Sequence, residues 1–282
     1  MRREVDRRLR GLAEIEEIMN AMKNLALIET RRLARVRDTQ RRLSASVDAA
    51  AAALAEARPE LAGDGTAGRD ALIALGSERG FCGDFNETLS RALPAPGRSG
   101  GTPALFIVGA RLSAKVADDR GVVARLAGPC TLDEVASVLL RVMDAVNHWL
   151  QAQGPALPLR MSVLHHPTPE AGVALRRLDP FGGRGGRRPA RGDGPLLNLE
   201  PRRLLGALTE HYLFAALHDV FYSSLLAENQ RRMQHMEAAM HRLSEQTDEL
   251  RRRRNALRQE DITEEIEVIL LSARSLFGGK AA

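Results

Sequence analysis

Three glycines occupy the place in this chain that is best suited to binding a phosphate group. Gly76, Gly80 and Gly83 follow a short apolar run typical of a buried strand and precede a predicted helix. Glycine turns at that place bind the pyrophosphate of dinucleotides when their spacing is G-x-G-x-x-G, which this turn lacks. The sequence also contains no G-x-x-x-x-G-K-[ST] loop for nucleotide phosphates. We therefore expect a structural strand-to-helix turn with no bound cofactor.

The histidines and cysteines lack the arrangements that catalysis or metal binding requires. His165 and His166 end a predicted strand, where adjacent side chains point to opposite faces. His211 and His218 share a helical face but lie about 10 Å apart, too far to share one metal ion. The two cysteines fit neither a disulfide framework nor a metal-ligand spacing, and are typical of small buried apolar residues. We therefore expect no metal or cofactor, and an enzyme that uses the α/β domain stays open only as a third possibility without an identifiable site.

A run of arginines is the charged segment with the most specific pattern. Arg251–Arg254 are consecutive, and Arg258 follows one turn later. Such a run usually forms a solvated helix face. Beyond it, however, an apolar stripe resumes at Ile262, Ile266 and Ile269. Two interpretations stay open: a solvated face, or an apolar helix end enclosed by a partner whose acidic groups face the arginines.

These arginines belong to a long helix predicted at the C-terminus. Residues 207–277 contain neither glycine nor proline. Mostly apolar residues alternate there in steps of three and four, the heptad pattern of a helix that packs along another helix. The seam consists of Met233, Met236, Met240, Leu243, Thr247 and Leu250. At about 1.5 Å per residue this helix is on the order of 100 Å long, so its seam needs a partner helix.

The N-terminal segment provides a matching helix. Residues 1–58 contain a single glycine and no proline, and one heptad phase runs from Val5 to Leu54. Twelve of its 15 positions are apolar, which favours a coiled coil over an ordinary amphipathic helix. We expect the two terminal helices to pair antiparallel, because the chain leaves one and returns beside it in the other.

Between these helices the hydrophobic pattern is that of buried strands alternating with helices. Strands are expected at 71–75, 104–108, 122–126, 159–165 and 172–178, and helices at 84–93, 112–118 and 131–153. Thr131 and Glu134 predict a capping box at the start of the last helix. This alternation predicts a doubly wound α/β domain with a mostly parallel sheet. The predicted divisions are a helix at 1–58, a linker at 59–69, the α/β domain at 70–201 with a Gly/Arg-rich loop at 179–195, and a helical segment at 202–282 that stops at Gly278 and Gly279.

Composition narrows the class of partner. Of the 282 residues 27% are charged, and the net charge of +5 is carried unevenly by arginine. This favours an acidic partner over general nucleic-acid binding. A basic coiled-coil scaffold that binds nucleic acid or an anionic membrane surface through Arg251–Arg254 and the Gly/Arg loop stays open as the alternative. Without a signal-peptide pattern or an apolar run of about 20 residues, we expect a soluble or peripheral intracellular protein.

Three blocks of the sequence resemble the gamma subunit, the central-stalk rotor, of F-type ATP synthases. IEEIMNAMK at 15–23, with Arg31 and Arg32, is similar to the family's Ala-Met-Lys step before a basic pair. SERGFCGDFN at 77–86 is similar to the family's Ser-Asp-Arg-Gly-Leu-Cys-Gly-Gly-Leu-Asn turn. ENQRRM at 228–233 and NALRQEDITEEI at 255–266 form the most specific block, similar to Glu-His-x-x-Arg-Met and Asn-x-x-Arg-Gln-x-x-Ile-Thr-x-Glu-Ile. The order and spacing of these blocks agree along essentially the whole chain.

The resemblance implies an antiparallel coiled coil of both termini around a Rossmann-like α/β domain. It implies a rotary shaft, without catalytic residues, that couples proton or sodium flow through the membrane c-ring to ATP synthesis or hydrolysis at the beta subunits. The implied partners are the alpha3beta3 hexamer, the epsilon subunit and the c-ring, with no nucleic acid, one copy per complex, on the cytoplasmic side of a bacterial inner membrane. Contacts with beta are expected at Met22, Lys23, Arg254, Arg258, Gln259, Thr263 and Glu265. The foot near the c-ring is expected at Leu197, Leu199, Glu200 and Pro201.

Departures from the family pattern leave two subtypes open. Asp84 stands where glycine is common, the stretch before Glu200 lacks the usual tyrosine, and the Gly/Arg loop is atypical. Both a housekeeping synthase and a divergent second F-type ATPase fit these features. The coupled ion and the preferred direction are also left open, since the c-ring determines the ion.

Overall fold

The structure is a computed structural model that describes residues 2–58, 68–94, 103–117, 121–153, 159–179 and 198–277, with side chains as far as 272. Most of the predicted linker, most of the Gly/Arg loop, Leu197 and the glycines at 278 and 279 lie outside these residues. The chain forms two compact units, Met1–Leu25 with Gln234–Ala282, and Ala26–Met233. The domain boundaries expected from the sequence stay predictions.

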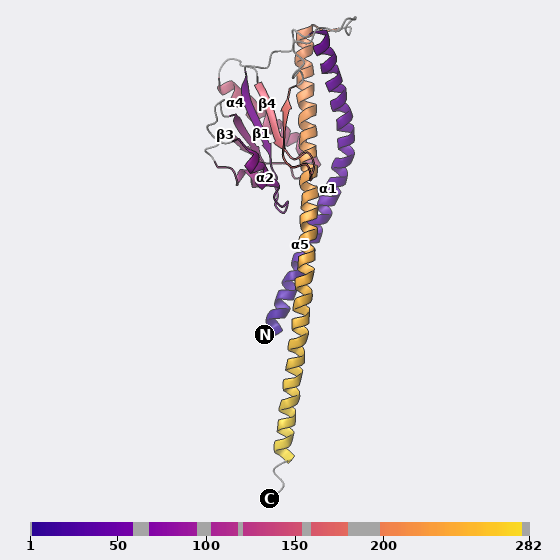
Figure 1. Ribbon diagram of the computed structural model, residues 1–282, viewed down its shortest axis with the longest axis vertical. Coiled ribbons are helices and arrows are strands. Elements are labelled where there is room, and N and C mark those ends of the chain that lie inside the picture. Colours follow the sequence, from indigo (N-terminus) through magenta and orange to yellow (C-terminus); the bar gives the residue numbers. More distant parts are fainter. Residues whose placement is uncertain are drawn as a thin grey trace. The chain divides into compact units, whose positions relative to one another are not determined.

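Helices and strands follow one another largely as the hydrophobic pattern indicates (Figure 1). In chain order they are α1 (Arg2–Ala57), β1 (Arg69–Leu75), α2 (Phe85–Ala92), β2 (Ala104–Val108), α3 (Ala110–Ser113), β3 (Val122–Leu126), the short 3₁₀ helix η3 (Leu132–Glu134), α4 (Val135–Ala152), β4 (Leu159–His165), β5 (Ala174–Leu178) and α5 (Pro201–Phe277). None of the described helices has an apolar stretch long enough to span a bilayer.

The unit Ala26–Met233 is built on a five-stranded sheet with the order β3-β2-β1-β4-β5. β1 pairs parallel with β2 and with β4, β2 pairs parallel with β3, and β5 runs antiparallel to β4. Ile73 at the centre of β1 lies opposite Phe106 on one side and Val163 on the other. The predicted mostly parallel sheet and its final hairpin are confirmed.

Helices cover both faces of this sheet, which explains why β2 reads as an unbroken apolar run. Ile73 and Phe106 point to the face that is packed by α4 and α5, together with Leu33 of α1. Their neighbours in the strands point to the opposite face, where Phe85 of α2 and Leu112 of α3 lie. All of these side chains are essentially inaccessible to solvent. Alternation along each strand thus divides the core into two layers.

In each unit the α1 and α5 segments lie antiparallel. In Ala26–Met233, the amide of Gln40 donates to the backbone carbonyl of Ala215 at 3.0 Å. In the other unit, Lys23 pairs with Glu237 at 2.8 Å and Arg2 with Asp261 at 3.6 Å, so a lower number on α1 matches a higher number on α5. The predicted antiparallel coiled coil is confirmed.

The heptad seam is followed closely by α5 and less closely by α1. All six predicted α5 positions are buried or half-buried, with Met236 fully enclosed. On α1, Val5, Ala26 and Leu33 are buried, whereas Ile15 and Leu43 are 47% and 48% exposed. A straight α-helix drifts about 20° per heptad away from a strict seven-residue repeat. A single heptad phase over this length therefore assigned some exposed residues to the interface.

Two local predictions are wrong. The helix expected at 112–118 is the single turn α3, which starts earlier, at Ala110. The capping box does not form, because the Thr131 side chain makes no capping hydrogen bond. Instead the Glu134 carboxylate accepts the backbone N–H of Cys130 at 2.7 Å, and a 3₁₀ turn precedes α4. The Thr-x-x-Glu pattern thus identified the start of the helix, but the Glu134 carboxylate binds the amide of Cys130 instead of that of Thr131.

Candidate functional site

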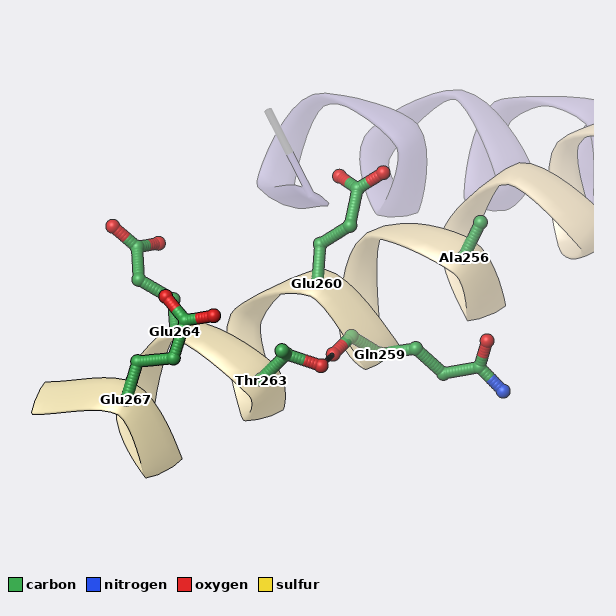
Figure 2. Close-up of a pocket in the computed structure, with 6 residues that line it drawn as sticks. All are labelled: Ala256, Gln259, Glu260, Thr263, Glu264 and Glu267. Carbon is green, nitrogen blue, oxygen red and sulfur yellow. Dashed lines mark hydrogen bonds between the residues drawn. The ribbon is translucent and has the colours of Figure 1, made fainter. Parts of the chain in front are cut away.

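The residues expected to contact beta near the C-terminus lie on a solvent-facing part of α5. Arg258, Gln259, Thr263 and Glu265 are exposed, and Arg254 is half-buried. Figure 2 shows Gln259 and Thr263 together in an open depression of the helix surface, where the Thr263 hydroxyl donates to the Gln259 carbonyl at 2.9 Å. The other lining residues are Ala256, Glu260, Glu264 and Glu267. An acidic face therefore follows the arginine run along the same helix.

The end of α5 presents apolar side chains that the described residues leave uncovered. The last described ion pair with α1 joins Arg2 to Asp261. Immediately beyond it, Ile262, Ile266 and Ile269 are 45%, 52% and 64% exposed. A series of exposed branched residues on a charged helix is typical of a contact surface, because a solvated helix has no need of them. The predicted apolar helix end is therefore present.

Met22 and Lys23 are not brought to the arginine run. Both are half-buried on α1, where the Lys23 ammonium pairs with Glu237. Glu237 and Arg254 are 17 positions apart, which corresponds to about 25 Å of helix. The expected contact residues thus form two patches on the unit rather than one.

At the expected foot, Pro201 is the first residue of α5. Proline suits the first position of a helix, because a backbone N–H there would have no acceptor within the helix and because the φ of proline is already helical. The Glu200 carbonyl accepts the N–H of Leu204 at 3.0 Å, and the Leu199 side chain is 49% exposed. Leu197 lies outside the described residues. The foot therefore combines a defined helix start with an exposed apolar residue.

Two of the sequence blocks that resemble the gamma family, residues 77–86 and 228–233, contact each other in the structure. Arg232 of α5 is 6% exposed and donates to the Gly80 carbonyl in the turn after β1 at 3.2 Å. The same guanidinium donates to Asn229 Oδ1 at 2.7 Å and pairs with the Glu228 carboxylate one helical turn away. The turn at residues 76–86 is thus bonded to α5 through the buried Arg232 guanidinium, which also pairs with Glu228 of its own helix, and we call this group of contacts the joint.

Burial changes the acidity of the carboxylate in the joint. Glu228 is 5% exposed. Loss of hydration raises its pKa to about 7, while Arg232 acts in the opposite direction by favouring the charged form. The negative charge of Glu78 contributes to this raised pKa. The joint therefore holds a carboxyl group that titrates near neutral pH.

Adjacent bonds give the turn its shape. Asn86 Oδ1 accepts the backbone N–H of Ser77 at 2.9 Å, and its amide donates to the Ser77 hydroxyl at 2.8 Å. Arg231 pairs with Asp84 and donates to the Pro169 carbonyl at 2.9 Å. Asp84, where the family commonly has glycine, thus provides a second link between the turn and α5.

Glu78 fastens the same turn to the strand ends. Its Oε2 accepts the backbone N–H of Ala110 at 2.9 Å and of Gly128 at 2.7 Å. These amides follow β2 and β3, so one carboxylate connects the carboxyl ends of three strands. Glu78, Glu228 and Arg232 lie in the sequence blocks that resemble the gamma family, but the sequence alone indicated no role for them. The i, i+4 spacing of Glu228 and Arg232 is the local pattern that predicts their pairing.

The crevice that binds nucleotides in related sheets is filled here by the chain itself. In doubly wound sheets that crevice lies at the carboxyl ends of the strands where the order reverses, here between β1 and β4. The His166 ring packs against Phe85 with 4.2 Å between ring centroids, and its nitrogens lie 3.0 Å from the Phe85 carbonyl and 3.1 Å from that of Gly172. A Cβ on Gly76 would lie 2.2 Å from Leu112 Cβ. Side chains of α2, of α3 and of the residue after β4 thus pack around this turn.

His165 and His166 belong to different environments. His165 lies near the ion pair of Arg176 with Asp219. Burial, together with the charge of Arg176, lowers the pKa of His165 to about 4. His166 lies in the packed crevice instead. Within the described ranges no three histidine, cysteine or acidic side chains are grouped closely enough to hold a metal ion.

Known proteins resemble this chain over almost its whole length. The family model described as ATP synthase matches residues 1–276. No curated protein sequence matches the chain. Among solved structures, a chain of the Euglena gracilis mitochondrial ATP synthase (OSCP/F1/c-ring, rotational state 3) is similar, with a TM-score of 0.64 at 16% identity over 100% of this chain and 96% of that chain.

Two further structures have the same fold. A chain of the Euglena gracilis mitochondrial ATP synthase rotor, rotational state 1, has a TM-score of 0.59 at 16% identity over 93% of this chain and 98% of that chain. A chain of the Tetrahymena thermophila mitochondrial ATP synthase central stalk and c-ring has a TM-score of 0.55 at 17% identity over 79% of this chain and 99% of that chain. With its antiparallel helices, its α/β domain and a family match from end to end, the chain belongs to the F1 gamma family, the central-stalk subunits of F-type ATP synthase.

Proposed function

We propose that this chain is the rotary shaft that couples ion flow through a membrane c-ring to ATP synthesis or hydrolysis at beta subunits. The observation that carries this proposal is the end of α5, where exposed isoleucines follow the arginine run beyond the last described α1 pairing. A shaft needs a stiff rod with unlike faces, so that each rotational position presents a different surface to equivalent partners. Long uninterrupted helices provide the stiffness, and the basic and acidic segments of α5 provide the unlike faces.

In this proposal the exposed charges of α5 exchange partners as the shaft turns. Exposed ion pairs contribute only about 0–1 kcal/mol each, so a contact made of them holds an angle and then releases it. Arg258 and Gln259 are the first candidates for contact with acidic loops of beta, followed by Arg254, Thr263 and Glu265. Met22 and Lys23 would form a separate contact farther along the shaft.

The remaining partners follow from the same proposal. The foot around Leu199, Glu200 and Pro201 would lie near the c-ring, and the epsilon subunit beside the α/β domain. One copy would turn inside an alpha3beta3 hexamer, peripheral to a bacterial inner membrane on its cytoplasmic side. The chain itself would contribute no catalytic group, and the c-ring would determine whether protons or sodium ions are coupled.

The test is ATP-driven ion pumping by the complex assembled with its alpha, beta and c subunits in vesicles. Replacing Arg258 or Gln259 with alanine is expected to lower pumping per ATP hydrolysed, because each removes an angle-dependent contact. Arg242→Ala is the matched control, since Arg242 is also exposed on α5 and bonds only to its own helix, at the Ala238 carbonyl, in the described structure. Unchanged coupling in both variants would refute the assignment of these contacts.

A basic scaffold makes a different prediction for the same purified chain. Binding of duplex DNA or anionic vesicles that falls steeply with salt, together with failure to assemble with alpha and beta, would favour the scaffold. Co-purification with alpha and beta favours the shaft.

A further inference from the structure

Three loops at one edge of the sheet bond to the two long helices within the unit Ala26–Met233. The loops follow β1, β3 and β4. These strands run in one direction, because β1 pairs parallel with β2 and with β4, and β2 pairs parallel with β3. The carboxyl ends of parallel strands lie at the same edge of a sheet. The bonds to α1 and α5 therefore come from one side of the α/β domain.

On α5, two adjacent arginines reach two of these loops. Arg232 donates to the Gly80 carbonyl in the loop after β1. Arg231 donates to the Pro169 carbonyl in the loop after β4 at 2.9 Å and pairs with Asp84 at the end of the first loop. Successive side chains on a helix point about 100° apart. The helix is thus held from two directions, which opposes its rotation about its own axis.

On α1, a carboxylate and a guanidinium reach the loop after β3. Glu29 accepts the backbone N–H of Leu132 at 3.1 Å. One nitrogen of Arg32 donates to both carboxylate oxygens of Asp133, at 3.1 and 3.0 Å, and another donates to Glu29 at 3.1 Å. The pair of Arg32 with Asp133 is exposed, and exposed ion pairs add little to stability. Its main effect is to fix the position of α1 against the loop.

The loops that hold the helices are also bonded to one another. The Glu78 carboxylate, in the loop after β1, accepts the backbone N–H of Gly128 in the loop after β3 at 2.7 Å. His166, the first residue after β4, has a ring nitrogen 3.0 Å from the carbonyl of Phe85 at the start of α2. The helices are therefore attached to one connected edge rather than to three independent loops.

These attachments lie next to the ends of the unit. On α1 the unit begins at Ala26, three positions before Glu29, and on α5 it ends at Met233, one position after Arg232. Both helices continue through these boundaries without a break. Each helix is thus fastened to the α/β domain close to the place where it passes out of the unit.

We propose that this edge of the sheet is a clamp that holds α1 and α5 together against the α/β domain, so that torque passes between the domain and both helices at once. The inference rests on the proposed function, because torque has a meaning only for a shaft. Without the clamp, either helix would be free to turn or slide against the domain under load. Asp84, where the family commonly has glycine, adds a link to the clamp of this chain.

The clamp is tested in the complex of this chain with alpha and beta subunits, fixed to a surface through the ring, with a bead attached to the α/β domain. The angular variance of the bead during pauses of ATP-driven rotation measures how firmly the domain follows the helices. Arg32→Met together with Arg231→Met removes one attachment on each helix and is expected to raise this variance about twofold. The rate of ATP hydrolysis is expected to stay unchanged, because neither residue is among the expected contacts with beta.

Arg91→Met is the matched control, since Arg91 is exposed and its described ion pair, with Glu87 at 3.3 Å, lies within α2. This variant is expected to keep the wild-type variance. An exchange of charges gives a second test: Arg32→Asp alone is expected to raise the variance, and adding Asp133→Arg is expected to restore it. If the contacts only stabilised the fold, the variants would melt at lower temperature and the variance of the assembled complex would stay the same.

The outcomes separate this inference from the proposed function. If the wild-type complex rotates and the double methionine variant has the same variance, the clamp is wrong and the proposed function stands. If that variant does not assemble, the charge exchange decides, and equal variance in Arg32→Asp with and without Asp133→Arg overturns the clamp. If the wild-type chain does not rotate within the ring, the proposed function fails and this inference fails with it.

Discussion

Replacing Arg232 with methionine tests whether the joint holds the turn at 76–86 to α5. Methionine keeps much of the side-chain volume but removes the three hydrogen-bond donors that reach Gly80, Asn229 and Glu228. The Glu228 carboxylate then stays buried without its counter-charge. Removing one partner of a buried ion pair typically destabilises by about 3–5 kcal/mol. Against a typical folding stability of about 5–15 kcal/mol, this is a large loss.

The expected loss depends on pH in a direction that the structure determines. At pH 8 the wild-type carboxylate is ionised beside Arg232, whereas in Arg232→Met, which lacks the charge that lowers the pKa of Glu228, the group must either stay buried as an uncompensated charge or take up a proton. At pH 6, below its pKa of about 7, the group is largely protonated and needs no counter-charge. The free energy of unfolding of Arg232→Met should therefore lie closer to that of the wild type at pH 6 than at pH 8.

Urea unfolding of the full chain measures this effect through tryptophan fluorescence. Trp149, the single tryptophan, packs edge-on against Phe106 at 6.0 Å between ring centroids, inside the unit that contains the joint. Arg242→Met, an exposed control on α5, should stay within about 0.5 kcal/mol of the wild type. A double Glu228→Met, Arg232→Met chain should lose less than the two single variants added together. A loss below about 1 kcal/mol at pH 8, or simple additivity, would refute the buried ion pair as the basis of the joint.

Two further predictions concern Glu228 of α5 and the turn that it helps to hold. The folded-state pKa of Glu228, about 7, exceeds the usual 4.5, so between these pH values the native state binds more protons than the unfolded state. The stability from Glu228 is therefore complete below pH 4.5 and declines by on the order of 3 kcal/mol as pH rises to about 7; Glu228→Gln should remove this slope from urea titrations between pH 5 and 8, and an unchanged slope would contradict the assignment. Gly76→Ala places a Cβ 2.2 Å from Leu112 Cβ and 2.9 Å from Asn86 Oδ1, so it should destabilise by about 1–3 kcal/mol in the same assay. The nearby Gly80→Ala, whose Cβ would approach Arg111 no closer than 3.6 Å, should leave the free energy of unfolding nearly unchanged. Equal losses of stability in the two variants would argue against crowding between Gly76 and Leu112 as the cause.

Much of the fold was predictable because it depends on local periodicity. The strands at 104–108, 122–126 and 159–165 have the predicted bounds. The strand at 104–108 is buried along its whole length, and a strand covered on both faces needs apolar residues throughout. The α5 seam was also predictable, because steps of three and four place its residues on one helical face. The arginine run and the apolar helix end were recognised for the same reason.

Other features depended on contacts between residues far apart in the chain. Arg232 and Gly80 are 152 positions apart, and nothing in either segment alone indicates that the guanidinium reaches that carbonyl. A heptad count assigns Ile15 to a covered seam, whereas its side chain is 47% exposed. Met22, Lys23 and Arg254 were all expected to contact beta, yet about 25 Å of helix separates the first two from the third.

By itself the sequence therefore determined the helices, the strands, the antiparallel pairing and the family, because each depends on patterns repeated over many neighbouring residues. Only the tertiary structure decided which charges are buried together, which seam positions stay open and how the turn is joined to α5. The physical reason is that burial and hydrogen bonding depend on three-dimensional distance. The pairing of Glu228 with Arg232 is local, but Glu228 acquires its raised pKa only when distant parts of the chain bury it.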